Sequence, residues 1–420
     1  MKRYEILALA VVLAASAGRL AAQTYRTFAE EYDEVRAKSG VQLGPLKVLP
    51  AFRLANVGYD SNVYYADKQD PAVADYTATL SPEVKGYWLL GSSALVSVTE
   101  NPEWSFYLKE KDLRTLVNSF VPAVRLFLLR RLALSGDYHF LEHFQPATSE
   151  LGTPVRDLRK GWSAHLFFET PRGTAIGLSG SLEDYAYNNA SLPDPEDEIS
   201  RALDHRERTA AFEFYYRVFS RSSIFATAGA TDYDFLDPAS SWRNARSYQT
   251  YGGFRFPLLG RARGTIALGY KRFIPRTEGL KSFSGLVADT DVALRTGRVG
   301  LSLAYTRDNY FSYIDTAYYY IEDRVRGGLA FYILPFLRLE GSCQLGALAY
   351  PEAQEVWFHG APYLVADRRD INRVFSAGLA VRITGSTGLS IGYNIYRRTS
   401  NAPGFDIDRN FIGAALAYDF

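Results

Sequence analysis

The chain has 420 residues, and its 47 Lys and Arg nearly balance 46 Asp and Glu, for a formal net charge of +1. This balance argues against a basic nucleic-acid surface and against an acidic tail. Aromatic residues form 15% of the chain, and mean hydropathy is only −0.15. After the first 22 residues no run approaches the ~18 apolar residues of a spanning helix. A membrane protein of this composition must be a β-barrel, because closure satisfies the backbone polar groups.

Residues 1–22 have the features of a secretory signal peptide. The chain begins with a basic Met1-Lys2-Arg3, continues with an Ala-rich apolar run to Ala17, and has small residues just before Gln23. We therefore expect cleavage after Ala22. A retained membrane anchor is the alternative. No Cys follows the cleavage site, which argues against a lipoprotein.

Residues 23–44 are expected to form a periplasmic segment with a short amphipathic helix. The segment is highly charged, and it has apolar or aromatic residues spaced 3 and 4 apart at Tyr25, Phe28, Tyr32 and Val35. This spacing places the four side chains on one helical face. Such a helix could dock a partner, plug the lower mouth of a barrel or remain a solvated leader.

Residues 45–420 consist of alternating segments joined by two kinds of connection. Short turns recur about every 40 residues near positions 91, 130, 171, 220, 259, 296, 334 and 385. Longer polar connections lie between them, such as Asp60 to Asp75 and Pro351 to Val365. These eight turns separate nine up-and-down units, which predicts 18 strands. The count becomes 16 if the hairpin from Ala94 to Arg130, interrupted by two prolines, is misassigned.

This pattern predicts an all-β fold, a transmembrane antiparallel up-and-down barrel over residues 45–420. Short periplasmic turns, longer extracellular loops and termini on the periplasmic side are expected. A propeller would repeat at a similar period, but its strands are shorter and its blades carry signature residues absent here. A soluble barrel would need the apolar stripes to face a core, and so wide a ring cannot be filled by side chains.

Alternation assigns each strand residue to the lipid or to the lumen. In the segment from Thr387 to Arg398, for example, Leu389 and Ile391 would point outward. Arg or Lys at mid-membrane on the lipid face costs ~2–4 kcal/mol, so charges belong in the lumen or at the rims. Asp323 breaks an outward stripe and is expected at a rim. The candidate lumen-lining residues are Glu322, Arg324, Arg326, Asp370, Arg382, Asn394 and Arg398.

Aromatic residues near the predicted strand ends are expected to form an interfacial girdle. They are Tyr59, Tyr64, Tyr65, Tyr310, Phe311, Tyr313 and Tyr318 to Tyr320. Ordinary packing within strands is the alternative for each residue.

The final segment, Ile412 to Phe420, alternates apolar residues with small or polar ones and ends on an aromatic residue. Its outward stripe includes Leu416, Tyr418 and Phe420. This ending resembles the signal by which the barrel-assembly machinery recognises outer-membrane barrels, so that machinery is an expected partner.

No catalytic, cofactor or metal site is expected, and the protein is not predicted to be an enzyme. The sequence contains no nucleophile elbow, phosphate loop or paired-Cys motif. Asp137, His139 and His143 share one strand face. His139 and His143 would lie about 13 Å apart at ~3.3 Å per residue, too far to share a metal ion. The single Cys343 is expected to pack as a small apolar side chain.

The first strand and its exit run from Pro50 to Tyr64 (PAFRLANVGYDSNVY), and Leu80-Ser81-Pro82 follows. This opening resembles that of outer-membrane β-barrel porins associated with exopolysaccharide export, in which an extended entry ends in a Tyr-Asp-x-Asn-Val-like turn. Asp60 and Asn62 match that turn. The resemblance implies contacts with outer-membrane lipid and lipopolysaccharide and a polysaccharide-export partner in the periplasm. The charge balance predicts no nucleic-acid partner.

The sequence and the resemblance together predict a porin-like channel in the outer membrane that passes polar solutes or an exported polysaccharide. The alternative is a non-conducting barrel whose loops, such as Asp60 to Asp75 and Glu352 to Val365, bind a surface partner.

Overall fold

The computed structural model describes residues 27–38, 40–152, 154–188, 202–219, 222–258, 261–314 and 316–419. The predicted signal peptide, most of the connection from Asn188 to Ile199, and Phe420 lie outside these residues. Among the described residues, no helix is long and apolar enough to cross a membrane.

Helix α1 (Phe28–Ala37) lies within the segment for which a helix was predicted. It begins with a capping box, in which the Glu30 backbone N–H donates to Thr27 Oγ1 (3.3 Å) and the Thr27 N–H donates to the Glu30 carboxylate (3.1 Å). Two orphan N–H groups of the first turn are thereby satisfied, which fixes the start of the helix.

The rest of the chain is almost entirely β-structure. The first strands are β1 (Val41–Leu43), β2 (Leu46–Asp60), β3 (Asp75–Leu90), β4 (Ala94–Tyr107), β5 (Thr115–Leu128), β6 (Leu132–Gln145), β7 (Val155–Glu169), β8 (Ala175–Asn188), β9 (His205–Arg217) and β10 (Ser223–Phe235). The later ones are β11 (Ala245–Leu258), β12 (Ala262–Pro275), β13 (Phe283–Thr296), β14 (Val299–Phe311), β15 (Tyr319–Leu334), β16 (Leu337–Ala349), β17 (Gln354–Phe358), β18 (Ala361–Val365), β19 (Arg369–Arg382), β20 (Thr387–Ser400) and β21 (Ile407–Asp419). Two 3₁₀ turns, η1 (Lys111–Leu113) and η2 (Pro238–Arg243), lie in loops.

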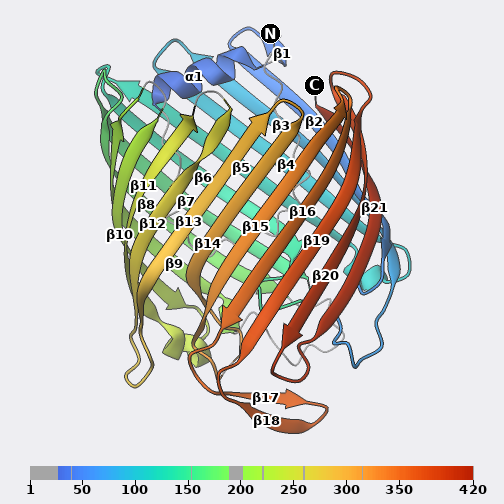
Figure 1. Ribbon diagram of the computed structural model, residues 1–420. Coiled ribbons are helices and arrows are strands. Elements are labelled where there is room, and N and C mark those ends of the chain that lie inside the picture. Colours follow the sequence, from blue (N-terminus) through green and yellow to red (C-terminus); the bar gives the residue numbers. More distant parts are fainter. Residues whose placement is uncertain are drawn as a thin grey trace.

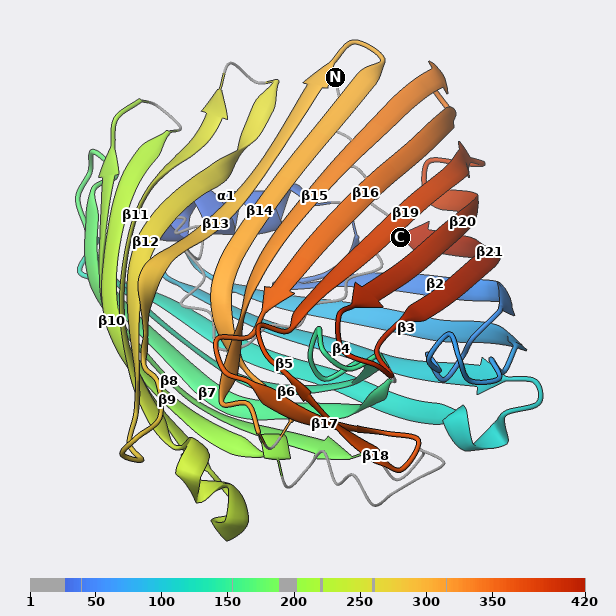
Figure 2. The same ribbon diagram turned by 60° about the horizontal axis from the view of Figure 1, so that its bottom comes forward.

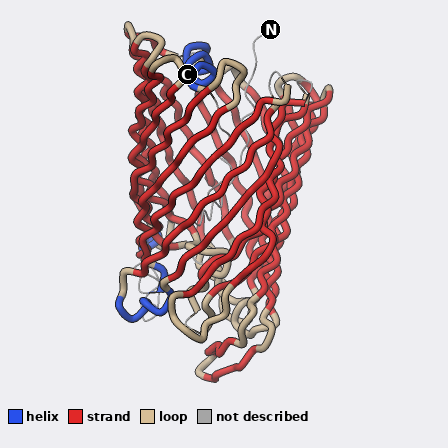
Figure 3. The backbone as a smooth tube through the Cα atoms, turned by 90° about the vertical axis from the view of Figure 1, so that its left-hand side faces the viewer, coloured by secondary structure: helices blue, strands red, loops and turns tan. Residues whose placement is uncertain are grey.

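The strands close into a single antiparallel barrel (Figures 1 and 3). One sheet contains 19 of the described strands. Three-residue β1 pairs only with the start of β2, in a short antiparallel hairpin, which leaves 18 strands in the ring. Each strand pairs with its neighbours in the chain, β16 pairs with β19 across the β17–β18 hairpin, and β2 pairs with β21. The predicted fold class and the count of 18 strands are confirmed.

The two rims of the barrel differ, as the sequence predicted. Short turns join β3 to β4, β5 to β6 and β7 to β8 at one rim, where both ends of the chain also lie (Figure 1). The opposite rim carries the long connections, and beyond it the β17–β18 hairpin projects from the barrel. We refer below to the short-turn end and the long-loop end.

Alternating side chains divide each strand between an outer belt and the interior. In β20, Leu389, Ile391 and Tyr393 are 40%, 57% and 43% exposed, whereas the intervening Ser390 and Gly392 are partly covered. The exposed stripe continues around the outside of the ring and forms an apolar belt. Such a belt suits contact with lipid acyl chains, because apolar surface is not stable in water at this extent.

Asp323, which interrupts the outer stripe of β15, lies near the long-loop rim as predicted. Its carboxylate accepts hydrogen bonds from Arg307 (2.5 Å) and from the Tyr305 hydroxyl (2.7 Å), both on neighbouring β14. The negative charge of Asp323 is thus balanced by Arg307 on the same outer face.

The seam at which the ring closes contains a β-bulge in β2. The register between β2 and β21 shifts between Leu54 and Val57, and Asn56 has a positive φ of 52°. Just beyond the bulge, a Cβ on Gly58 would lie 2.0 Å from the carbonyl oxygen of Ile412. Only glycine permits this approach, so residue 58 determines how closely the first and last strands meet.

The predicted aromatic girdle is wrong for most of its members. Tyr310, Tyr318, Tyr319 and Tyr320 are at most 7% exposed and pack in clusters inside the barrel, and Phe311 contacts the same interior rings. A residue facing lipid would be exposed in the isolated protein, as Tyr59 is at 40%. The loops and strand ends at this rim turn inward, so these aromatic rings lie inside the barrel.

Replacement of Ile391 tests the assignment of the outer belt. Ile391→Arg places a charge at mid-strand on that belt and is expected to lower the free energy of unfolding by about 2–4 kcal/mol. Ser390→Arg, the control, points into the interior beside Ala380 and Ala415 and should cost much less. Urea unfolding of the two variants in lipid vesicles makes the comparison, and equal losses would contradict the assignment.

Candidate functional site: the barrel interior

The inner wall differs between the two halves of the ring. From β7 to β13 the interior is packed with aromatic side chains, including Phe167, Tyr215, Phe225, Tyr233, Tyr251, Phe273 and Phe283. From β15 to β21 many inward positions are small, including Gly328, Ala330, Ser342, Gly378, Gly392 and Gly413. The side chains of the aromatic half therefore extend further into the interior than the small side chains of the other half do.

The loop between β6 and β7, in its described residues 146–152 and 154, crosses the interior and is fastened to the opposite wall. Ser149 Oγ donates to the Glu322 carboxylate (3.1 Å) and accepts from Arg324 Nη2 (2.8 Å), both on β15, nearly halfway around the ring from β7. Asn372 on β19 donates to the Ser149 carbonyl (3.2 Å). These contacts place residues 148–150 across the bore near its long-loop end.

Glu150 anchors the same loop with both its side chain and its backbone. Its carboxylate accepts from the Ser312 hydroxyl (2.8 Å) and the Tyr313 N–H (2.9 Å), and Arg398 donates to its carbonyl oxygen. The side chain is 1% exposed. Burial raises the pKa of Glu150, and the nearby Arg368 guanidinium partly opposes that rise.

A buried ion-pair group lies behind this anchor. Both oxygens of Asp370 bind Arg368 (2.7 and 3.1 Å), and Arg398 also donates to Asp370. The Arg368 guanidinium lies 3.7 Å from the ring centroid of Phe405. All three charged side chains are at most 2% exposed. One carboxylate therefore holds two arginines, one of which in turn holds the crossing loop.

The structure brings together four of the seven predicted lumen-lining residues. Glu322, Arg324, Asp370 and Arg398 gather around the crossing loop. Arg326 lies further along β15 and donates to Gln344 Oε1 (2.7 Å) on β16. Asn394 lies at the middle of β20. Arg382 lies at the short-turn end of β19.

Sequence reasoning missed Ser149, Glu150, Arg243 and Arg368, which complete the interior network. Arg243, in η2, donates to the carbonyls of Ser312 and Ile314 in the β14–β15 loop. All four missed residues belong to loops, where no periodicity shows which way a side chain points. The two adjacent polar residues Ser149-Glu150 within a predicted loop were the only available signal.

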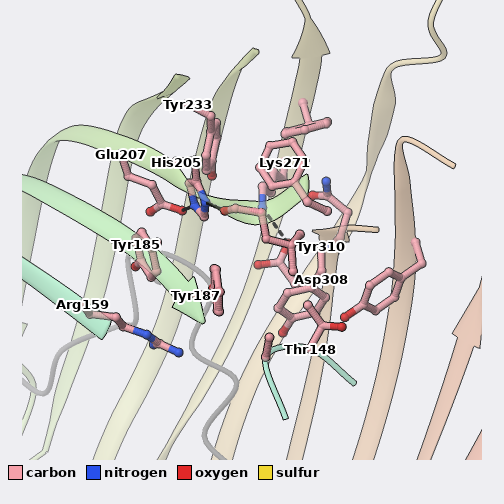
Figure 4. Close-up of a pocket in the computed structure, with 16 residues that line it drawn as sticks. Thr148, Arg159, Tyr185, Tyr187, His205, Glu207, Tyr233, Lys271, Asp308 and Tyr310 are labelled. Carbon is pink, nitrogen blue, oxygen red and sulfur yellow. Dashed lines mark hydrogen bonds and ion pairs between the residues drawn. The ribbon is translucent and has the colours of Figure 1, made fainter. Parts of the chain in front are cut away.

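A small pocket of about 50 Å³, partly open to solvent, lies at the long-loop end of the interior (Figure 4). Its aromatic lining consists of Tyr185, Tyr187, Tyr233, Phe273, Tyr310, Phe311 and Tyr320. Its charged groups are paired: Lys271 Nζ lies 2.9 Å from Asp308, and His205 Nε2 lies 3.2 Å from Glu207. Such a lining favours ligands with ring faces and hydroxyl groups over ligands of high charge.

The candidate metal residues are not arranged as ligands. His139 Nδ1 lies 3.2 Å from Asp137, which also accepts from the Ser163 hydroxyl. In the part of the chain that the structure describes, no group of three or more His, Cys, Asp or Glu side chains could hold a metal ion. Asp137 and His139 lie on the inner face of β6, where Asp137 bonds both His139 and Ser163.

Leu416 and Tyr418, two of the predicted assembly-signal residues, share the outer face of β21 with Ile412. Tyr418 is 38% exposed. The third, Phe420, lies outside the described residues. Recognition by the barrel-assembly machinery stays a prediction.

Removal of Asp370 tests how far the buried group supports the fold. Asp370→Ala takes the shared carboxylate from two buried arginines and is expected to lower the free energy of unfolding by about 3–5 kcal/mol. Asp323→Ala breaks the partly exposed pair with Arg307 and should cost only about 0–1 kcal/mol. Urea titration of both variants checks the difference, and a small loss for Asp370→Ala would contradict the anchoring role.

Asp204, just before β9, gives a prediction about pH. Burial raises its pKa to about 6, and its Oδ1 accepts the Tyr187 N–H (2.8 Å). An unfolded carboxyl titrates near 4, so the folded state gains stability from the protonated form below that pH and loses it as pH rises through 6. Asp204→Asn keeps the acceptor, so we expect a urea midpoint that falls less between pH 4 and 7 than in the wild type. Parallel pH profiles would contradict this assignment.

Comparison with solved structures supports the fold. The OccK2 (OpdF) structure from Pseudomonas aeruginosa has a TM-score of 0.52 and 14% identity, covering 91% of this chain and 99% of that chain. A second structure of OccK2 (OpdF), in complex with glucuronate, has a TM-score of 0.51 and 13% identity over the same shares. The outer membrane protein OpdK of the same species has a TM-score of 0.50 and 11% identity, covering 89% and 98%.

No curated protein matches the chain. Residues 171–420, more than half of the sequence, match the model of the family described as "Putative beta-barrel porin 2". The matched part begins in the turn after β7 and includes the whole small-residue half of the interior wall. The chain therefore belongs to this family of β-barrel porins and is a porin-like barrel of the outer membrane.

Proposed function

We propose that the barrel is a diffusion channel for small polar solutes. The observation that carries this proposal is the β6–β7 loop, whose Ser149 and Glu150 are fastened across the bore to β15 and β20. A loop held inside the ring reduces the cross-section and lines it with hydrogen-bonding groups. Small hydrated solutes fit such a passage better than a wide polymer does.

The charges around the passage are paired, which bears on selectivity. Glu322 pairs with Arg324 (2.7 Å), Lys271 with Asp308 (2.9 Å), and Asp60 with Arg409. Paired charges produce a smaller field in the lumen than a ring of one sign does. We therefore infer that the channel selects weakly between anions and cations, and that it selects solutes by size and polarity. We propose no enzymatic activity.

A saccharide, including an exported polysaccharide, is the second candidate. The pocket at the long-loop end supports it, because its tyrosine rings and paired charges offer both ring faces and hydrogen-bond partners. The structure of OccK2 with glucuronate shows that another barrel of this fold takes a sugar acid. Deleting the gene and measuring surface polysaccharide tests the export role, which predicts loss of exported polymer and a partner in the periplasm.

Substitution of Glu150 tests whether the crossing loop limits flow. The wild-type protein should give discrete single-channel currents in planar bilayers. Glu150→Ala removes the two carboxylate acceptors and keeps the bond from Arg398 to the backbone carbonyl, so the loop should loosen and the conductance should rise. Glu150→Gln, the control, can still accept the Tyr313 N–H and bond Ser312, and it should stay close to the wild type.

Absence of current from the folded wild-type barrel would overturn the channel proposal and favour a barrel whose loops bind a surface partner. A liposome-swelling series with glucose, glucuronate and longer oligosaccharides then separates the two candidates. Entry of the monosaccharides alone supports the small-solute channel. Entry of the long oligosaccharides supports passage of a polymer.

A further inference from the structure

Helix α1 lies inside the short-turn, periplasmic mouth of the barrel (Figures 1 and 2). Its buried residues Phe28 and Val35, 4% and 3% exposed, pack in one cluster with Leu95 of β4. Phe28 also stacks on Phe127 of β5, with ring centroids 5.3 Å apart. Phe127 is on the interior face of β5, because its neighbour Leu128 is 42% exposed on the outer face.

Charged groups of the inner wall hold the first turn of the helix. Glu31 pairs with Arg125 of β5, and Glu30 pairs with Arg217 of β9 (2.7 Å). The Phe28 N–H donates to Glu169 of β7 (3.1 Å). The helix thus contacts strands from β4 to β9, a large arc of the periplasmic rim.

The last turn of α1 is held by a single side chain of β2. Lys47 Nζ donates to the carbonyls of Val35 (3.1 Å) and Arg36 (2.9 Å), and Lys47 is 5% exposed. A cation at these orphan carbonyls stabilises the end of a helix. Both ends of α1 therefore have polar partners on the wall, and none of its backbone belongs to the barrel's hydrogen-bond ladder.

We propose that α1 is a displaceable stopper of the periplasmic opening, held in place by charge and released when its ion pairs are broken. The proposal goes beyond the channel function but rests on it for the effect on flow. Docking against the inner wall places the helix in the path between the lumen and the periplasm. It narrows the opening on the side of β4 to β9.

Several observations make the helix displaceable. It has only ten residues, and so short a helix is marginal without packing. Two of its side chains are fully buried, and its ion pairs are partly exposed, with Glu30 at 46% and Glu31 at 32%. Pairs of this kind are weak and are screened by salt. Loss of the contacts frees α1 while the ring of strands stays closed.

Tryptic cleavage of the full-length folded protein tests whether the ion pairs hold α1 against the inner wall. Cleavage after Arg36, which lies within α1, requires the last turn of the helix to unwind and lose its contacts with the wall. Glu31→Gln removes the pair with Arg125 and should speed cleavage on the order of two- to fivefold, the range of one partly exposed pair. Asp33→Asn, the matched control on the exposed face, should cleave at the wild-type rate. Raising NaCl from 0.1 to 1 M should speed cleavage of the wild type more than that of Glu31→Gln.

Single-channel recording of the same proteins tests the effect on flow. Glu31→Gln should show a larger conductance, or more time in a larger state, than the wild type and Asp33→Asn. The charge-swapped pair Glu31→Arg with Arg125→Glu should return the current toward the wild-type value. The β-sheet signal in the far-ultraviolet circular dichroism spectrum of each variant verifies that the barrel has folded.

The outcomes separate this proposal from the channel function. Equal cleavage of all variants at all salt concentrations would overturn a charge-held helix. Faster cleavage with unchanged current would show that α1 is seated but does not restrict flow, and the stopper would be rejected. No current from any variant would defeat the proposed function, and a stopper of flow with it.

Discussion

Closure of the ring is the constraint on which the whole structure depends. In the hydrocarbon of a membrane no water is present to satisfy a free strand edge, so every N–H and C=O must find a partner within the protein. Here the pairing of β2 with β21 removes the last two edges. The bulge at Asn56 and the bare backbone of Gly58 let these strands meet at a position where a side chain would collide. The apolar belt and the polar interior are both consequences of that closure.

Inside the closed ring, charged groups serve mainly to hold loops and the helix against the wall. Arg398 links Asp370 of the wall to the backbone of Glu150, and Lys47 links β2 to the carbonyl end of α1. In each case a wall residue reaches a segment that has no strand partners of its own. The narrowing of the bore therefore arises from chain segments added to a scaffold that would close without them.

The sequence predicted what is periodic and failed where periodicity ends. The recurring short turns predicted the strand number. Alternation predicted the outward stripe of Leu389 and Ile391, because a strand with two different environments cannot slip by one residue. It did not predict that Tyr318 and Tyr320 turn inward, because girdle and interior aromatics have the same composition and the same place near strand ends. Glu150 was missed for the related reason that a loop has no repeating geometry. The helix was located from its spacing, but its seat depends on Arg125 and Glu169, which are distant in sequence.

The unequal halves of the inner wall have a consequence for how anything would travel through the barrel. With bulky rings on the side of β7 to β13 and glycine, alanine and serine on the side of β15 to β21, the conduit is eccentric. A solute on the side of β15 to β21 would meet short stretches of small residues, such as Gly378 and Gly392, between the polar side chains of Arg326 and Asn394. Its environment would then change along the barrel, from backbone-lined stretches to the paired charges beside the crossing loop.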